Sequence, residues 1–209
     1  MSAATVRDAA PTVDGKRVFD LVVSGVGLVV LSPLLTAVGL AVRLDSCGPA
    51  IFRQQRVGLR GEHFRIHKFR SLRAGGRGAL ISPHGDPRVT RIGAVLRRTK
   101  LDELPQLVDV WTGHMSLVGP RPEVPCYVAL WPEAERAIIL SVRPGITDPA
   151  SIELRNEAEE LRSAADPEEH YVHSLLPRKV ELYVAYVHGR TFLGDLGILA
   201  RTLLTVIRD

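Results

Sequence analysis

The stretch that decides the architecture is VFDLVVSGVGLVVLSPLLTAVGLAV, residues 18–42. Its 25 residues carry a single charge, Asp20, near the start. At about 1.5 Å per residue, a helix of this length can cross the roughly 30 Å hydrocarbon core of a bilayer. The stretch therefore predicts a membrane-embedded helix. A buried helix of a soluble protein is the alternative, although such helices seldom exceed about 20 residues without a polar face.

Two features predict that this segment turns back inside the membrane. Ser32-Pro33 lies near its middle, where proline removes a backbone hydrogen bond and kinks a helix, and the serine hydroxyl can cover the freed carbonyl. Basic residues flank the segment on both sides, namely Lys16, Arg17, Arg43, Arg53 and Arg56. Because basic flanks favour the cytoplasmic side, both ends are expected there, with Ser32-Pro33 deepest. A straight transmembrane helix is the alternative, whereas a secretory signal would start earlier and end in a small-residue cleavage site.

A second apolar pattern lies near the other end, in FLGDLGILARTLLTVI, residues 192–207. Its apolar residues recur at helical spacing and are interrupted by Asp195 and Arg201. The pattern is typical of an amphipathic helix at a membrane interface. It is equally typical of a helix packed on the protein core, and both interpretations stay open.

Between these segments the pattern indicates a helix-rich α+β chain. Alternating apolar and polar residues on both sides of a glycine turn predict a β-hairpin, with strands over 51–57 and 63–69. Helices are predicted over 88–98, 104–111 with Gly113 as its stop, 132–142, 153–165 and 177–188. Residues 71–87 indicate a loop, and the three prolines within 119–125 exclude regular structure there.

Composition excludes several classes of protein. A net charge of +4 is too small to indicate a nucleic-acid binder, and 45% apolar residues exclude a disordered chain. Cys47 and Cys126 are too few for a disulfide framework or a four-cysteine zinc site. The histidine pairs at 63/67 and 170/173 lack the glutamate of a zinc-protease motif. Aromatic residues, at 5%, argue against a stacking surface for single-stranded nucleic acid.

Charge is distributed unevenly along the chain. Residues 53–100 hold 13 basic and 2 acidic side chains, whereas residues 148–169 hold 8 acidic and 2 basic ones. A concentrated basic block indicates an anionic partner, such as a phosphorylated substrate or an anionic membrane surface. A solvated basic surface is the plain alternative.

The candidate catalytic and phosphate-binding side chains cluster between residues 97 and 121. Asp102 and Glu103 stand together at a predicted helix start, just before Leu104-Pro105. Two such acids can hold Mg²⁺ with its bridging phosphates, or one of them can attack phosphorus directly. Guanidinium and ammonium groups, which suit phosphate oxygens, surround them in the sequence at Arg97, Arg98, Lys100 and Arg121. The alternative is that Asp102 only caps the helix and Arg121 pairs with Glu123.

An ordered set of motifs resembles the bacterial sugar transferases, the small monotopic phosphoglycosyl transferases. The motifs are KRVFD (16–20), the Ser32-Pro33 break, GPAIFRQQRVG (48–58), FRIHKFRS (64–71), DPRVTRIG (86–93), LDELPQL (101–107), MSLVGPRP (115–122) and RPGIT (143–147). The resemblance implies a compact domain on the cytoplasmic face of the bacterial inner membrane, anchored by a re-entrant helix and interfacial amphipathic helices. The expected organisation is a flexible tail (1–15), a re-entrant membrane helix (16–44) and a catalytic domain (45–209).

The resemblance also implies an activity and a site. It implies transfer of a sugar-1-phosphate from a UDP-sugar to polyprenyl (undecaprenyl) phosphate with release of UMP, the first membrane step of a glycan or exopolysaccharide pathway. Asp102 would form a phosphosugar-aspartyl intermediate, Glu103 would support metal or proton handling, and both would bind Mg²⁺. The expected substrate-binding residues are Arg121, Pro120, Lys68, Arg70 and Arg97. The expected partners are the two substrates and membrane lipids, with no nucleic acid.

Some questions stay open in the sequence. After RPGIT, better-known relatives continue with a Trp-Ala-Gln type segment, whereas this chain has DPASI, residues 148–152, and then an acidic stretch, 153–169. The sugar is therefore not determined, and neither is the oligomeric state, for which a homodimer is one option. Larger relatives carry extra transmembrane helices, so the chain is expected to be the minimal form. Two other functions stay open, a membrane-anchored scaffold with an inert dyad and a peripheral binder of anionic lipid or nucleic acid.

Overall fold

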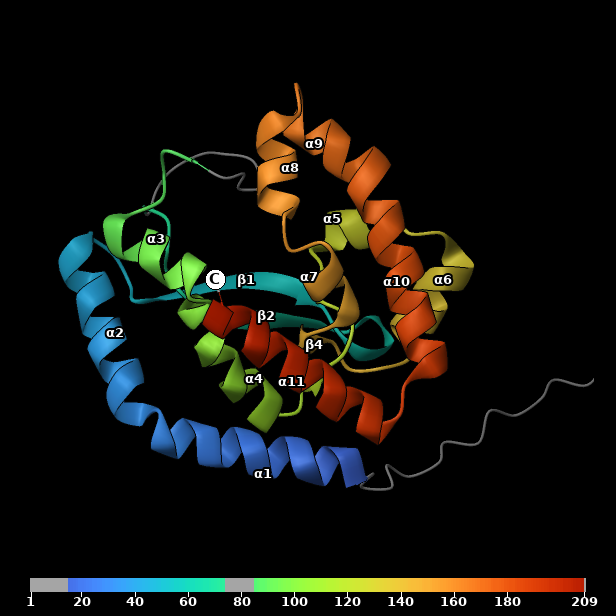
Figure 1. Cartoon of the computed structure of the whole chain (residues 1–209), viewed down its shortest axis with the longest axis horizontal. Helices are drawn as coiled ribbons and strands as arrows, with labels where there is room; N and C mark the ends of the chain where they lie inside the picture. The colour runs from blue at the N-terminus through green and yellow to red at the C-terminus, as the bar shows by residue number, and fades with distance from the viewer. Residues whose placement is uncertain (1–14, 74–84, 209) are drawn as a thin grey trace, which may run out of the picture.

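The computed structural model describes residues 15–73 and 85–208. The tail predicted over 1–15 lies outside this part except for Gly15, and so do residues 74–84 of the predicted loop. Two apolar helices run along the edge of a domain that contains a β-hairpin and many short helices (Figure 1). The α+β, helix-rich class is confirmed.

The break at Ser32-Pro33 is confirmed. Helix α1 (Gly15–Val30) and helix α2 (Ser32–Asp45) meet at Leu31 with a bend of 63°. Pro33 has no N–H to donate to the carbonyl of Val29, and the Ser32 hydroxyl donates to that carbonyl at 2.8 Å instead. Among the described residues, no unbroken helix has the length and apolarity to cross a bilayer, whereas the bent α1–α2 pair together does.

The predicted hairpin has the observed bounds. Strands β1 (Ile51–Val57) and β2 (His63–Phe69) pair antiparallel, with Ile51 opposite Phe69 and Val57 opposite His63. A short 3₁₀ turn, η1 (Leu59–Gly61), connects them, and Gly61 supplies the positive φ of 83° that this turn requires. The free edge of β2 is covered, because the Asp109 carboxylate accepts the His67 N–H at 2.9 Å.

The helices around the dyad differ in detail from the prediction. Helix α3 (Arg91–Arg98) begins later than predicted because the Thr90 hydroxyl accepts the Gly93 N–H and so caps it. The single helix predicted over 104–111 is a 3₁₀ helix, η2 (Leu101–Gln106), followed by α4 (Leu107–Trp111). Pro105 within η2 cannot donate a backbone hydrogen bond, so regular α-helix starts only after it. Gly113, at φ 94°, follows the end of α4 as predicted.

A small parallel sheet was not predicted. Strand β3 (Ser116–Val118) pairs with β4 (Gly145–Thr147). A Cβ atom on Gly145 would lie 2.1 Å from the backbone nitrogen of Gly119, so the two chains can approach this closely only through glycine. The pair brings the prolines that follow β3 next to RPGIT, and the chain stays irregular until Pro125, as predicted.

The second half is helical and forms the largest core cluster, around Trp131, Leu175 and Tyr183. Its helices are α5 (Pro125–Val128), α6 (Glu133–Ile139), α7 (Pro149–Glu153), α8 (Glu157–Ser163), α9 (Pro167–His170), the π-helical turn η3 (Tyr171–Leu175), α10 (Leu176–Gly189) and α11 (Phe192–Arg208). The predicted helix over 153–165 is thus split, because Asp148 caps α7 and the chain leaves the helix after Glu153. Helices over 132–142 and 177–188 are confirmed within a few residues.

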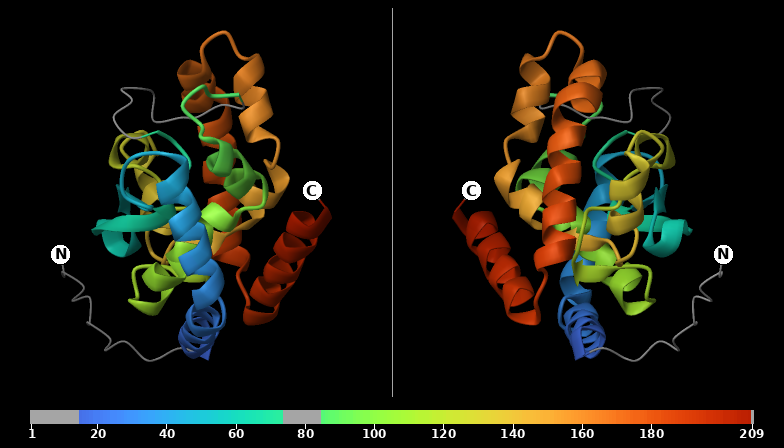
Figure 2. Two further views of the ribbon diagram at one scale, coloured as in Figure 1. Left: turned by 90° about the vertical axis from the view of Figure 1, so that its left-hand side faces the viewer. Right: turned by 90° about the vertical axis from the view of Figure 1, so that its right-hand side faces the viewer.

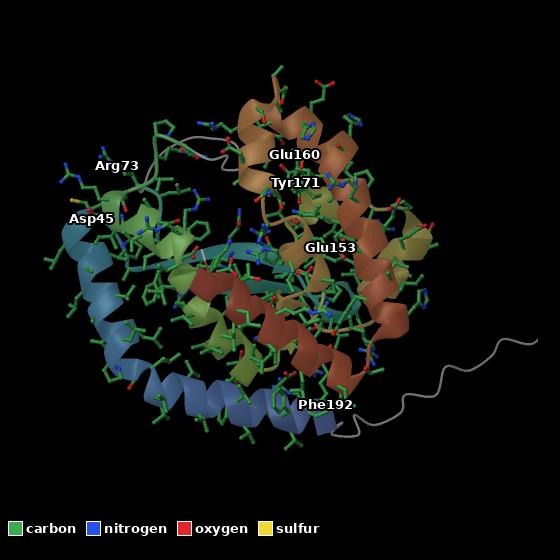
Figure 3. The ribbon with its side chains drawn as sticks, in the orientation of Figure 1. Asp45, Arg73, Glu153, Glu160, Tyr171 and Phe192 are labelled. Atoms are coloured by element: carbon green, nitrogen blue, oxygen red, sulfur yellow. The ribbon has the colours of Figure 1, made fainter. Side chains whose placement is uncertain are left out.

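Helix α11 packs on the protein and also exposes apolar residues. The Phe192 ring meets the Phe19 ring of α1 edge to face, with 5.4 Å between centroids, and Figure 3 labels Phe192 beside the start of α1. Leu199 packs against the core cluster of β2, α4 and β3. Leu193 and Leu203 remain 78% and 64% exposed. Figure 2 shows α11 on the flank of the domain, with its outer side uncovered.

Candidate active site

The dyad lies where three parts of the chain meet. Asp102 and Glu103 are in the first turn of η2, which follows a left-handed residue, Lys100, at φ 56°. Helix η2 packs against both β2 and α3. The loop after β3 brings Arg121 to the same place. The hairpin, η2 and the Gly-Pro-Arg-Pro loop therefore build one site.

Both carboxylate oxygens of Glu103 accept hydrogen bonds from cationic side chains. Its Oε1 accepts from Lys68 Nζ at 2.9 Å and from Arg121 Nη2, and its Oε2 accepts from Arg121 Nη1 at 3.2 Å. The Glu103 side chain is only 14% exposed. Such bidentate Arg–carboxylate contacts fix geometry as well as charge.

In this cluster, Glu103 and its two cationic partners stabilise one another's charged forms. Burial alone would raise the pKa of Glu103, but Arg121 and Lys68 outweigh it and hold that pKa well below its usual value. The Glu103 carboxylate in turn raises the pKa of Arg121. Burial lowers the pKa of Lys68 to about 8, although Glu103 opposes the shift. Glu103 therefore stays ionised and acts as the counter-ion of the two cations.

Asp102 has the opposite environment. Its Oδ1 is buried and accepts no hydrogen bond from the part of the chain that the structure describes. Burial, and then the neighbouring Glu103 charge, raise the pKa of Asp102. A buried carboxylate oxygen without a donor is unfavourable unless a ligand completes its contacts. Of the two acids, Asp102 is the one available to a cation or a reacting phosphorus.

The other predicted site residues fall into different places. Pro120 is buried, and its carbonyl accepts the Gly145 N–H at 3.0 Å, which fixes the loop that carries Arg121. Arg97 lies half-buried in the last turn of α3, which packs on η2. Arg70 has another role, because its guanidinium donates to main-chain carbonyls from Val42 and from residues 46–49. These contacts anchor the end of α2, and the structure does not bring Arg70 together with Glu103, Lys68 and Arg121. Its role as a substrate-binding residue stays a prediction.

The alternative in which Asp102 only caps the helix and Arg121 pairs with Glu123 is wrong. Helix η2 has Lys100 at its cap position and no side-chain capping hydrogen bond. Glu123 pairs with Arg56 at 3.4 Å, and accepts from the Tyr171 hydroxyl at 2.6 Å. This second buried charge cluster was not predicted, because Tyr171 lies far along the chain from Glu123. The signal in the sequence was an acidic residue directly after Gly-Pro-Arg-Pro.

The described residues offer few grouped ligands for a metal ion. Within residues 15–73 and 85–208, no group of three or more His, Cys, Asp or Glu side chains converges. Mg²⁺ commonly takes only one or two carboxylates, and completes its shell with water and substrate phosphates. The unpartnered Oδ1 of Asp102 fits that requirement, whereas both oxygens of Glu103 are already occupied.

The site thus combines a largely buried Asp-Glu pair with Lys68 and Arg121, cations whose geometry suits carboxylate and phosphate oxygens. The family model described as bacterial sugar transferase matches residues 12–209, and the chain belongs to this family.

Named relatives agree with this assignment. The chain is 37% identical over 198 residues to a UDP-glucose:undecaprenyl-phosphate glucose-1-phosphate transferase of Caulobacter vibrioides, covering 92% of this chain and 69% of that one. It is 43% identical over 141 residues to a protein of the same name from Escherichia coli K12, covering 66% and 30%. It is 40% identical over 144 residues to a UDP-N-acetylgalactosamine-undecaprenyl-phosphate N-acetylgalactosaminephosphotransferase of Aeromonas hydrophila, covering 66% and 33%. The matched part is thus about a third of the last two proteins.

Proposed function

We propose that this protein transfers a sugar-1-phosphate from a UDP-sugar to polyprenyl phosphate, in practice undecaprenyl phosphate, and releases UMP. The observation that carries the proposal is the buried Oδ1 of Asp102, which has no hydrogen-bond partner among the described residues, beside a Glu103 that is neutralised by Lys68 and Arg121. The names of the relatives support the two substrates but differ in the sugar, which stays open.

The proposed reaction has two displacements at one phosphorus. An Asp102 oxygen bonds to the β-phosphorus of the UDP-sugar, the bond from that phosphorus to the bridging oxygen breaks, and UMP leaves with the electron pair. An oxygen of polyprenyl phosphate then bonds to the same phosphorus, and the Asp102 carboxylate leaves. Arg121 and Lys68 supply positive potential for the phosphate oxygens and hold Glu103 in place.

Mg²⁺ is the proposed cofactor. Asp102 would hold it, with Glu103 as the nearest second carboxylate, and the bound ion would neutralise charge on the diphosphate. Neither Cys47 nor Cys126 is expected to contribute, because thiolates suit softer metals.

The proposed location is the bacterial inner membrane, with the domain on the cytoplasmic face. Both ends of the α1–α2 pair are tied to the same domain. Arg17 donates to the Val110 carbonyl at 2.8 Å near the start of α1, and Arg70 donates to the Ser46 carbonyl at 2.7 Å after the end of α2. Between these ties, apolar side chains of both helices are exposed, among them Val29 at 74%. This arrangement favours a re-entrant helix, assisted by the exposed side of α11.

Release of UMP tests the function directly. Incubation of the full chain in vesicles with undecaprenyl phosphate and a panel of UDP-sugars is expected to release UMP with at least one sugar. Excess chelator is expected to abolish the release and added Mg²⁺ to restore it, because the diphosphate charge would otherwise be uncompensated. A Cys47→Ser, Cys126→Ser double variant serves as the control and should retain activity. No release with any UDP-sugar would favour an inert scaffold, and full activity in chelator would exclude the metal.

The pH dependence of the rate follows from the two shifted groups. Asp102 must be ionised to attack, and its pKa is raised by burial and by Glu103, so the rate should rise as this group loses its proton. Lys68 must be protonated to pair with anions, and burial lowers its pKa to about 8, so the rate should fall as pH passes about 8. In Lys68→Arg the guanidinium stays charged, and the fall near pH 8 should disappear. A fall that persists unchanged in Lys68→Arg would contradict this role of Lys68.

Topology gives a separate expectation. Pro33→Ala, combined with Ser32→Ala, restores a continuous hydrogen-bonded helix and should shift part of the population toward a straight span. Single cysteines near residues 13 and 46, in a background without the native ones, can be labelled from each side of oriented vesicles. In the wild type both should label from the cytoplasmic side. Labelling from opposite sides in the wild type would leave the enzyme proposal intact but exclude the re-entrant helix.

A further inference from the structure

An open apolar groove of about 690 Å³ lies between α1 and the end of α4. Its walls are side chains of α1 within residues 21–30 and the indole of Trp111, and none of them is polar. Trp111 rests directly on the backbone of α1, since a Cβ atom on Gly25 would lie 2.4 Å from its ring. Arg17 fixes this arrangement by donating to the carbonyls of Val110 and Trp111.

Apolar side chains lie between the groove and the dyad. Val108 and Trp111 are three residues apart in α4, a spacing that places side chains on one side of a helix. Half-buried Leu104 precedes them in η2, next to the dyad in the sequence. Val108 and Trp111 are 38% and 51% exposed. From the rise of 3₁₀ and α helices, the backbone from Asp102 to Trp111 spans at most roughly 15 Å. The path thus starts at the charged site that holds Lys68 and Arg121 and ends in a purely apolar groove.

We infer that this groove and these apolar side chains bind the isoprenoid chain of the acceptor, which places its phosphate at Asp102. The inference rests on the proposed function and extends it to a binding site. Three observations select this occupant. The groove offers only apolar contacts, the other end of the path offers Lys68 and Arg121, and η2 and α4 follow one another directly from the dyad to Trp111. A ligand with one anionic end and a long apolar chain matches that order of surfaces.

The groove should matter for only one of the two displacements. The first displacement consumes the UDP-sugar and needs no isoprenoid, so release of UMP in the absence of acceptor should not depend on Trp111. The second displacement should depend on Trp111, and more so for long acceptors, because a short chain does not reach the groove. A bulk-lipid acyl chain in the groove would produce no such dependence on acceptor length.

The test compares two acceptors in vesicles of constant lipid composition. Trp111→Ala removes the indole, and Val26→Trp fills the groove from α1, where Val26 is exposed. Leu193→Ala is the control, since it removes an exposed apolar side chain of α11 outside the groove. For undecaprenyl phosphate, the KM of both groove variants is expected to rise about tenfold, the scale of a lost aromatic contact at a binding surface. For geranyl phosphate, and for UMP release without acceptor, both variants should equal the wild type.

The outcomes separate this inference from the function on which it rests. Equal losses with both acceptors, or no loss with either, would overturn the inference while the transferase activity of the wild type stands. An equal rise of KM in Leu193→Ala would also overturn it, because general membrane contact would then explain the effect. Failure of the wild type to release UMP from any UDP-sugar would overturn the proposed function, and this inference with it.

Discussion

Replacing Asp102 by Asn is expected to lower sugar-phosphate transfer by roughly a thousandfold or more, the scale seen when a nucleophile is removed. The amide keeps the shape of the side chain but cannot attack phosphorus. The fold should survive, because Oδ1 of Asp102 accepts no hydrogen bond within the described residues and its burial already disfavours the charge. Turnover and the unfolding midpoint, measured on the same preparation, separate the two effects.

A matched control exists for this substitution. Asp166 caps α9 by accepting from the backbone of Glu168 and Glu169 at an exposed position. Asn caps helices as well as Asp does, so Asp166→Asn should leave both turnover and stability near the wild-type values. If Asp102→Asn retained turnover comparable to Asp166→Asn, Asp102 would not be the nucleophile.

Replacing Glu103 by Gln is expected to lower the free energy of unfolding by on the order of 3 kcal/mol, because it removes the counter-ion of two partly buried cations. Lys68 and Arg121 would then face a neutral amide whose NH₂ group cannot accept from them. Activity should fall as well, by roughly a hundredfold, since Arg121 would lose its fixed position. Chemical denaturation gives the stability and steady-state assays give the rate.

The surface pair Glu159–Arg162 is the control, with side chains 56% and 59% exposed. Glu159→Gln removes the same charge from a solvated pair and should change stability by less than about 1 kcal/mol. The Glu103 variant has a second signature, because Glu103 raises the pKa of Lys68 and its loss should move the alkaline fall of the rate below about pH 8. Equal stability losses in the two variants, with no movement of the pH profile, would contradict the role of Glu103 as a buried counter-ion.

Local patterns were sufficient for much of the fold. The hairpin strands Ile51–Val57 and His63–Phe69 were predicted at their observed bounds, since alternation and a glycine turn are signals within one short segment. The bend at Ser32-Pro33 was predicted because proline acts on its own helix. The dyad itself was predicted from adjacent acids near a basic block and from the order of the motifs.

Contacts between distant segments were not predictable in the same way. Strands β3 and β4 have three residues each, too few for a periodic signal, and they pair across the 26 residues that separate Val118 from Gly145. Proximity in the sequence does not identify the partner of Arg121. Glu123 is only two residues away, but Arg121 binds Glu103. Arg70 belongs to a basic block like Lys68, but only the fold shows that it binds carbonyls at the end of α2.

The central claim is that Asp102 carries the phosphosugar between the two displacements. Mass spectrometry of peptides from the wild-type protein, after incubation with its UDP-sugar and Mg²⁺ in the absence of acceptor, tests it most directly. We expect a phosphosugar adduct on the peptide that contains Asp102, mapped to that carboxylate, absent from Asp102→Asn and lost on addition of undecaprenyl phosphate. An adduct mapped to Glu103 or another residue, or release of UMP only when acceptor is present and with no adduct at any time, would contradict the account.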